Sequence, residues 1–163
     1  MTETTQKRVV VFFARVVATG FGAGFAPVAP GTFGTAVAVP IAWALAGLSL
    51  PAYAAVTAGV TLLAIVCARI ADDSWATHDT GRIVVDEIAG YLVTMALVPR
   101  DRPLALAAGF LLFRLLDITK PPPARWIDRR LPGGSGVVLD DVTVGIYGAI
   151  VLWAGWRYLP HPP

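Results

Sequence analysis

The segment from Val16 to Ala68 contains no charged residue. A chain can accommodate such a run only by packing apolar helices against one another on all sides or by exposing them to lipid. Of the 163 residues, 56% are hydrophobic and 15% are charged, whereas a typical globular domain has roughly 25% charged residues. The length fits one domain with one core. The net charge of +2 is too small and too scattered to indicate a nucleic-acid partner.

Apolar segments separated by Gly, Pro and charged turns predict an all-α fold. We expect a single domain over residues 1–163, with disordered tails at 1–6 and 160–163. The predicted architecture is a compact bundle of five to seven helices, embedded in or associated with a membrane. A tightly packed soluble bundle is the alternative, because two of the apolar segments are too short to cross a bilayer. The helices are expected at residues 7–19, 36–48, 52–71, 84–98, 104–120 and 142–158.

Three charged residues stand at the end of the fifth expected helix. Arg114, Asp117 and Lys120 are spaced three residues apart, so they lie near one another on one helical face. The proline run after Lys120 cannot continue the helix. The charges therefore sit at the mouth of an apolar element, where pairing with phosphate or with carboxylates is expected for Arg114 and Lys120.

Two pairs of adjacent acids precede apolar helices. Asp86-Glu87 and Asp140-Asp141 are each expected in a first turn, where the helix dipole favours a carboxylate. Capping needs only one acid per helix, and buried like charges are costly unless a cation joins them. Clustered oxygen ligands without Cys or His favour Mg²⁺ or Mn²⁺. The single Cys67 excludes a disulfide framework within the chain and a cysteine zinc site.

Several other polar residues are weaker candidates. The loop before the second helix, with Gly31, Thr32 and Thr35, offers N–H groups and hydroxyls to an anion, and either threonine could cap that helix. The Gly-Lys-Ser/Thr of a phosphate-binding P-loop is missing from it. Arg125 adds positive charge near Lys120, with a solvated or membrane-surface position as the alternative. His78 and Asp79 could form a proton shuttle, although a solvated loop histidine explains them equally well.

These charged blocks occur in an order that resembles a known family. The runs from His78 to Gly90, Phe113 to Pro123 and Arg125 to Asp141, together with the Gly20 to Thr35 loop, are similar to the motifs of bacterial phosphatidylglycerophosphatase A. The resemblance covers nearly the whole chain from Gly20 to Gly148.

The resemblance implies a Mg²⁺-dependent hydrolase that removes the terminal phosphate of phosphatidylglycerol phosphate. It further implies the cytoplasmic (inner) membrane, an active site facing the cytoplasm and a phospholipid substrate; a homo-oligomer is compatible with it. We expect Mg²⁺ on Asp86, Glu87, Asp140 and Asp141, and in-line attack by a metal-bound water.

Within that scheme, Arg114 and Lys120 would bind the phosphate, and Asp117 would be a further ligand or a general base. Two other classes of membrane protein also contain clustered or intramembrane acids. A small transporter or channel subunit could also use intramembrane acids. A CDP-alcohol phosphatidyltransferase would need a spaced aspartate pattern that this chain lacks.

Overall fold

The computed structural model describes residues 3–75, 81–131 and 134–158, which contain seven α-helices and no strand. The predicted all-α bundle is thereby confirmed. The helices are α1 (Glu3–Ala18), α2 (Pro30–Ala44), α3 (Leu50–Trp75), α4 (Val85–Thr94), α5 (Pro103–Thr119), α6 (Ala124–Arg130) and α7 (Gly134–Tyr158); two 3₁₀ turns, η1 (Ala23–Phe25) and η2 (Met95–Leu97), complete the elements.

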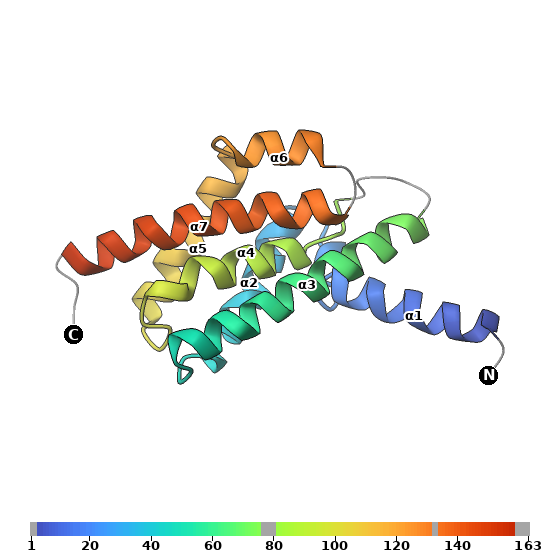
Figure 1. Ribbon diagram of the computed structural model, residues 1–163, viewed down its shortest axis with the longest axis horizontal. Coiled ribbons are helices and arrows are strands. Elements are labelled where there is room, and N and C mark those ends of the chain that lie inside the picture. Colours follow the sequence, from blue (N-terminus) through green and yellow to red (C-terminus); the bar gives the residue numbers. More distant parts are fainter. Residues whose placement is uncertain (1–2, 76–80, 132–133, 159–163) are drawn as a thin grey trace.

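The short helix α4 lies at the centre of the bundle. It packs between α3 and α7, while α2 and α5 cover its other side, and α6 lies across the first half of α7 (Figure 1). Helix α7 runs parallel to α4 and α3 runs in the opposite direction (Figure 1). The N-terminal ends of α4 and α7 therefore lie at the same end of the bundle, which we call the site end.

Aromatic side chains fill the core and use their hydroxyls to satisfy buried carbonyls. Tyr53 donates a hydrogen bond to the Leu92 carbonyl over 2.7 Å, and Tyr91 donates to the Leu106 carbonyl over 3.0 Å. Phe113 packs edge-on against Tyr91 and is fully buried. These contacts tie α3 and α5 to the central helix, since a buried hydroxyl without a partner would be costly.

Within the described part of the chain, two helices are long and apolar enough to cross a membrane, by length and composition. They are Leu50–Trp75 and Gly136–Tyr158, with mean hydropathies of 2.0 and 1.7. Only 28% and 44% of their most apolar windows are buried inside the molecule. Large apolar side chains such as Leu62, Leu63 and Ile150 are exposed. Such long exposed apolar faces are typical of helices that contact lipid.

Several helix boundaries differ from the expectation. Helix α1 begins at Glu3 rather than at Lys7, so the part of the expected tail from Glu3 onward is helical. Helix α3 continues to Trp75, and α6 lies outside the expected helices. At α3, the charged residues Arg69, Asp72 and Asp73 were interpreted as a helix end. Side chains on the outer face of a helix can be charged without interrupting it.

Two start points matter most for the site. Helix α2 begins at Pro30, six residues before the expected start at Ala36, and α7 begins at Gly134 instead of near Val142. Proline suits a first helical position because its missing N–H has no partner there. The glycines of α7 are retained within the helix because a Cβ at Gly134 or Gly136 would collide with neighbouring backbone.

Candidate active site

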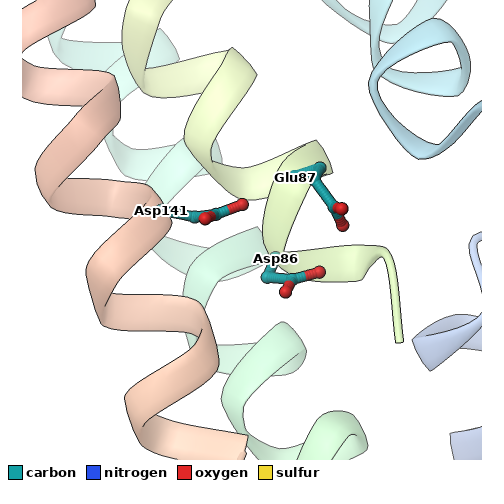
Figure 2. Close-up of side chains that lie close together, drawn as sticks. All are labelled: Asp86, Glu87 and Asp141. Atoms are coloured by element: carbon teal, nitrogen blue, oxygen red, sulfur yellow. The ribbon is translucent and has the colours of Figure 1, made fainter. Parts of the chain in front are cut away.

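Three carboxylates meet at the site end of the bundle. Asp86 and Glu87 lie in the first turn of α4, as predicted, and Asp141 projects from α7 (Figure 2). One oxygen from each residue lies within 4.8 Å of the other two. The sequence distance between Glu87 and Asp141 is large, so the group exists only because α4 and α7 pack side by side.

Small residues allow this close packing. A Cβ on Gly145 would overlap the Gly90 carbonyl oxygen. A Cβ on Gly90 would come within 2.7 Å of the Asp141 carbonyl oxygen. One turn further along, Gly148 of α7 faces the Thr94 side chain. The two helix backbones thus approach each other more closely than larger side chains would permit, which places Asp141 beside Asp86.

The first turn of α4 is also held from the opposite side. The Val84 N–H donates to the Ala18 carbonyl over 2.8 Å, which ties the turn to the end of α1. Gly34 of α2 packs against Val84, where a Cβ would come within 2.6 Å of the valine Cβ. Contacts from α1, α2 and α7 therefore fix the position of Asp86 and Glu87.

Two of the acids are buried, Glu87 is half-buried, and all three are incompletely hydrogen-bonded. Asp86 and Asp141 are 6% and 3% exposed. Asp86 Oδ1, Glu87 Oε2 and Asp141 Oδ2 are buried without a hydrogen-bond partner. Burial, followed by the negative charge of Glu87, raises the pKa of Asp86 well above its ordinary value. Burial likewise raises the pKa of Glu87.

Such a donor set fits a hard divalent cation. Buried carboxylates with unpartnered oxygens are normally stabilised by a cation, and oxygen-only ligands suit Mg²⁺, Mn²⁺ or Ca²⁺. The dipole alone does not explain the group. Asp141 lies about two turns into α7, where a helix N-terminus no longer stabilises a carboxylate appreciably.

Arg114 supplies the positive charge beside the cluster. Its Nη1 lies 2.7 Å from Asp117 Oδ2 and 3.8 Å from Glu87 Oε1. The predicted proximity of Arg114 and Asp117 on one helical face is confirmed. Gly31, near the start of α2, packs against the same place, since its Cβ would overlap Glu87 Oε1 and lie 3.0 Å from Arg114 Nη1.

Lys120 and Asp140 form a second pair close by. Lys120 Nζ donates to Asp140 Oδ2 over 2.5 Å, and the Asp140 side chain is 1% exposed. The lysine ends α5 in a left-handed conformation with φ of 42°, which turns its side chain toward α7. Asp140 was expected in the group with Asp141, but it lies against Lys120 and is not one of the three clustered acids. The expectation that Asp140-Asp141 occupy a first helical turn is wrong, because α7 begins at Gly134.

The remaining predicted residues lie around this centre. Thr35 is buried, and its hydroxyl donates to the Gly31 carbonyl over 2.9 Å. Neither Thr32 nor Thr35 caps α2, because both lie inside the helix and its N-cap residue is Ala29. The exposed Arg125 donates to the Thr119 carbonyl over 2.8 Å at the end of α5. The candidates His78 and Asp79 lie outside the described residues.

Comparison with known proteins identifies the family. The sequence model of phosphatidylglycerophosphatase A matches residues 16–156. The chain belongs to the phosphatidylglycerophosphatase A family. Phosphatidylglycerophosphatase A of Escherichia coli K12 is 37% identical over 139 residues, which cover 85% of this chain and 80% of the relative. The Haemophilus influenzae protein of the same name is 35% identical over 140 residues, which cover 85% of this chain and 86% of that protein.

Another relative differs in its stated substrate. A Bacteroides thetaiotaomicron protein, named provisionally as a phosphatidylinositol-3-phosphatase, is 37% identical over 149 residues, covering 86% of this chain and 92% of that protein. No solved structure matches this chain significantly. Membership of the phosphatidylglycerophosphatase A family makes this chain a phosphatase. Its two long apolar helices indicate association with a membrane, and the acidic group is its candidate active site.

Two features of the site were missed from the sequence. One is that Asp141 joins the acidic cluster while Asp140 pairs with Lys120, and the other is the glycine contact between α4 and α7. The second had a signal, because Gly90 and Gly145 interrupt otherwise apolar helices without ending them. An isolated glycine inside a helix often marks close packing.

Proposed function

We propose that this protein hydrolyses the terminal phosphomonoester of phosphatidylglycerol phosphate in a Mg²⁺-dependent reaction, releasing phosphatidylglycerol and phosphate. One observation carries the proposal. In a chain of this family, the buried Asp86 and Asp141 and the half-buried Glu87, each with an unpartnered oxygen, converge within 4.8 Å beside an arginine. Phosphoryl transfer depends mainly on positioning and on charge stabilisation, and this group offers both.

The metal would be held by Asp86, Glu87 and Asp141. When bound, Mg²⁺ supplies charge to polarise a phosphoryl oxygen and to acidify a water molecule. The unpartnered oxygens of these three carboxylates are the available ligand atoms. Glu87 also lies 3.8 Å from Arg114, so this carboxylate can link the metal to the guanidinium group.

Arg114 and Lys120 would receive the phosphate. The guanidinium group presents several N–H donors in a fixed plane that suits phosphate oxygens, and Asp117 keeps it directed at the cluster through the 2.7 Å pair. Asp140 holds the Lys120 ammonium group in the same way, through their hydrogen bond. Asp117 is accordingly a positioning residue, and it also remains our candidate for the general base.

The start of α2 completes the phosphate side of the site. Gly31 and Thr32 lie in its first turn, where the positive end of the helix dipole favours an anion. Thr35 supports this turn through its bond to Gly31. Arg125 would act on the approaching headgroup from the start of α6, and His78 with Asp79 would relay a proton.

The distribution of cations supports a cytoplasmic active site at the inner membrane. At the site end lie Arg15, Arg69, Arg82, Arg114, Lys120 and Arg125, whereas Arg100, Arg102 and Arg157 lie at the opposite end of α4, α5 and α7. An excess of Lys and Arg marks the cytoplasmic side of membrane proteins. The bound lipid would thus present its headgroup from the cytoplasmic leaflet.

The deciding experiment is phosphate release from phosphatidylglycerol phosphate in detergent micelles, with Mg²⁺ or with EDTA. Wild type should release phosphate only with the metal, and Asp86→Asn should be inactive while remaining folded. Asp101→Asn is the matched control, because Asp101 is an exposed acid at the opposite end of the bundle. Absence of release by folded wild type would refute the proposal.

The same assay addresses the substrate of the Bacteroides relative. Phosphatidylinositol 3-phosphate should be offered under identical conditions, since both lipids present a phosphomonoester near the membrane surface. We expect the higher kcat/KM for phosphatidylglycerol phosphate, in line with the two relatives that bear that name.

A further inference from the structure

An apolar groove lies between α2 and α5, away from the charged cluster. Its volume is about 450 Å³. Val39 forms its α2 wall, and the first half of α5 forms the rest. Apolar side chains line it throughout: Val39, Pro103, Leu106, Ala107, Phe110 and Leu111.

The α5 wall of the groove leads directly to the active site. Its lining residues follow one helical stripe, spaced three or four positions apart, and the next position on that stripe is Arg114. Residues at this spacing are neighbours on a helix surface. Arg114 contacts Asp117 and Glu87, so a ligand in the groove would reach the phosphate-binding guanidinium group without leaving this face of α5.

The α2 wall leads to the same place. Val39 lies four positions after Thr35 and eight after Gly31, which places the three residues on one face of α2. Gly31 packs against Glu87 and Arg114. The two helices that form the groove are thus the two that close over the Glu87 side of the acidic cluster.

The dimensions suit a lipid chain. From Pro103 to Leu111 the groove extends about 5 to 16 Å from Arg114 along α5, at 1.5 Å per residue. One leaflet provides about 15 Å of hydrocarbon, half of the roughly 30 Å core of a bilayer. A phosphomonoester held at Arg114 would therefore have its acyl chains at the depth of the groove.

We propose that the groove between α2 and α5 binds an acyl chain of the phospholipid substrate while the headgroup phosphate occupies the Arg114 side of the acidic cluster. This inference rests on the proposed lipid phosphatase function. Burial of methylene groups there adds binding energy remote from the reacting phosphate. The groove would select lipids over water-soluble phosphomonoesters.

The test fills the groove without disturbing the core. Ala107 lines the groove and is exposed, so Ala107→Trp should fold normally and occupy the space of the chain. Leu111→Asn places a polar amide on a groove side chain that is 69% exposed. Ala55→Trp is the matched control, because Ala55 is an exposed alanine on α3 that does not line the groove.

Each variant is assayed on dipalmitoyl phosphatidylglycerol phosphate and on its deacylated, water-soluble headgroup. For Ala107→Trp we expect KM for the lipid to rise about tenfold, since excluding two methylenes changes affinity by that order, and Leu111→Asn should change it in the same direction. Hydrolysis of the deacylated headgroup should be unchanged, and Ala55→Trp should match wild type on both substrates.

Two results would overturn the inference while leaving the proposed function intact. One is active wild type with no change in lipid KM in either groove variant. The other is an equal loss on lipid and on deacylated headgroup, which would indicate a general defect. Failure of wild type to hydrolyse either substrate would refute the proposed function itself.

Discussion

Gly31 of α2 packs directly against the Glu87 carboxylate of α4. A Cβ at this glycine would overlap Glu87 Oε1 and approach Arg114 Nη1 to 3.0 Å. The backbone of α2 therefore forms one wall of the acidic site, and a glycine is required there for space. Backbone conformation is not the reason, because Gly31 is not among the positive-φ residues.

Gly31→Ala should reduce kcat/KM more than tenfold. Alanine favours a helix over glycine by roughly 0.5–1 kcal/mol, so the loss would come from displacement of Glu87 and Arg114. Gly59→Ala on α3 is the control, since nothing lies within 4 Å of its added Cβ. It should retain activity and gain slightly in Tm. Wild-type activity in Gly31→Ala would contradict the position of Glu87.

The pair of Lys120 and Asp140 predicts a stability effect that can be separated from catalysis. Lys120→Met should lower the free energy of unfolding by about 1–3 kcal/mol, because it removes the Lys120 ammonium group from the buried Asp140 carboxylate. Adding Asp140→Asn should recover part of that loss. A double-mutant cycle in detergent, followed by denaturant titration, measures the coupling.

Activity distinguishes the two roles of Lys120. If Lys120 binds phosphate, the double variant should regain stability but stay inactive. Recovery of both stability and phosphate release in the double variant would show that Lys120 serves only to neutralise Asp140.

Asp117→Asn tests the positioning of Arg114. The neutral amide cannot form the charged 2.7 Å pair, so the guanidinium group should lose its fixed direction and kcat should fall about 10–100-fold at saturating Mg²⁺, the range of a lost positioning contact. Asp101→Asn again serves as the control. An unchanged kcat would remove Asp117 from the mechanism both as a positioning residue and as a base.

The raised pKa values of Asp86 and Glu87 predict how pH affects the metal-free protein. Between the ordinary carboxyl pKa, about 4, and the raised values, the folded state binds more protons than the unfolded state. Stability with EDTA should therefore fall as pH rises through this window. Mg²⁺ should reverse the fall, because it binds the ionised carboxylates and not the protonated ones.

Thermal unfolding at about pH 5 and pH 8, with EDTA and with Mg²⁺, measures this dependence. Asp86→Asn combined with Glu87→Gln should flatten the EDTA profile. A profile that is already flat in wild type, or the same slope in the double variant, would contradict the burial of these charges.

Local sequence patterns were sufficient to predict the helical fold and the contacts within single helices. The uncharged run from Val16 to Ala68 predicts apolar helices, because backbone groups in apolar surroundings must be satisfied within the helix. The first-turn position of Asp86-Glu87 and the pairing of Arg114 with Asp117 are confirmed. Both depend on relations within one helix, which spacing in the sequence expresses directly.

Only the tertiary structure decided which of the two acids of α7 joins the cluster on α4 and which pairs with Lys120. Asp140 and Asp141 are adjacent in sequence, but successive residues on a helix point about 100° apart. Which of them faces α4 depends on the rotation of α7 about its axis, and the close contact of Gly145 with Gly90 sets that rotation. Asp141 consequently joins Asp86 and Glu87, while Asp140 meets Lys120. No local pattern could indicate this choice, because it arises from packing between segments more than fifty residues apart.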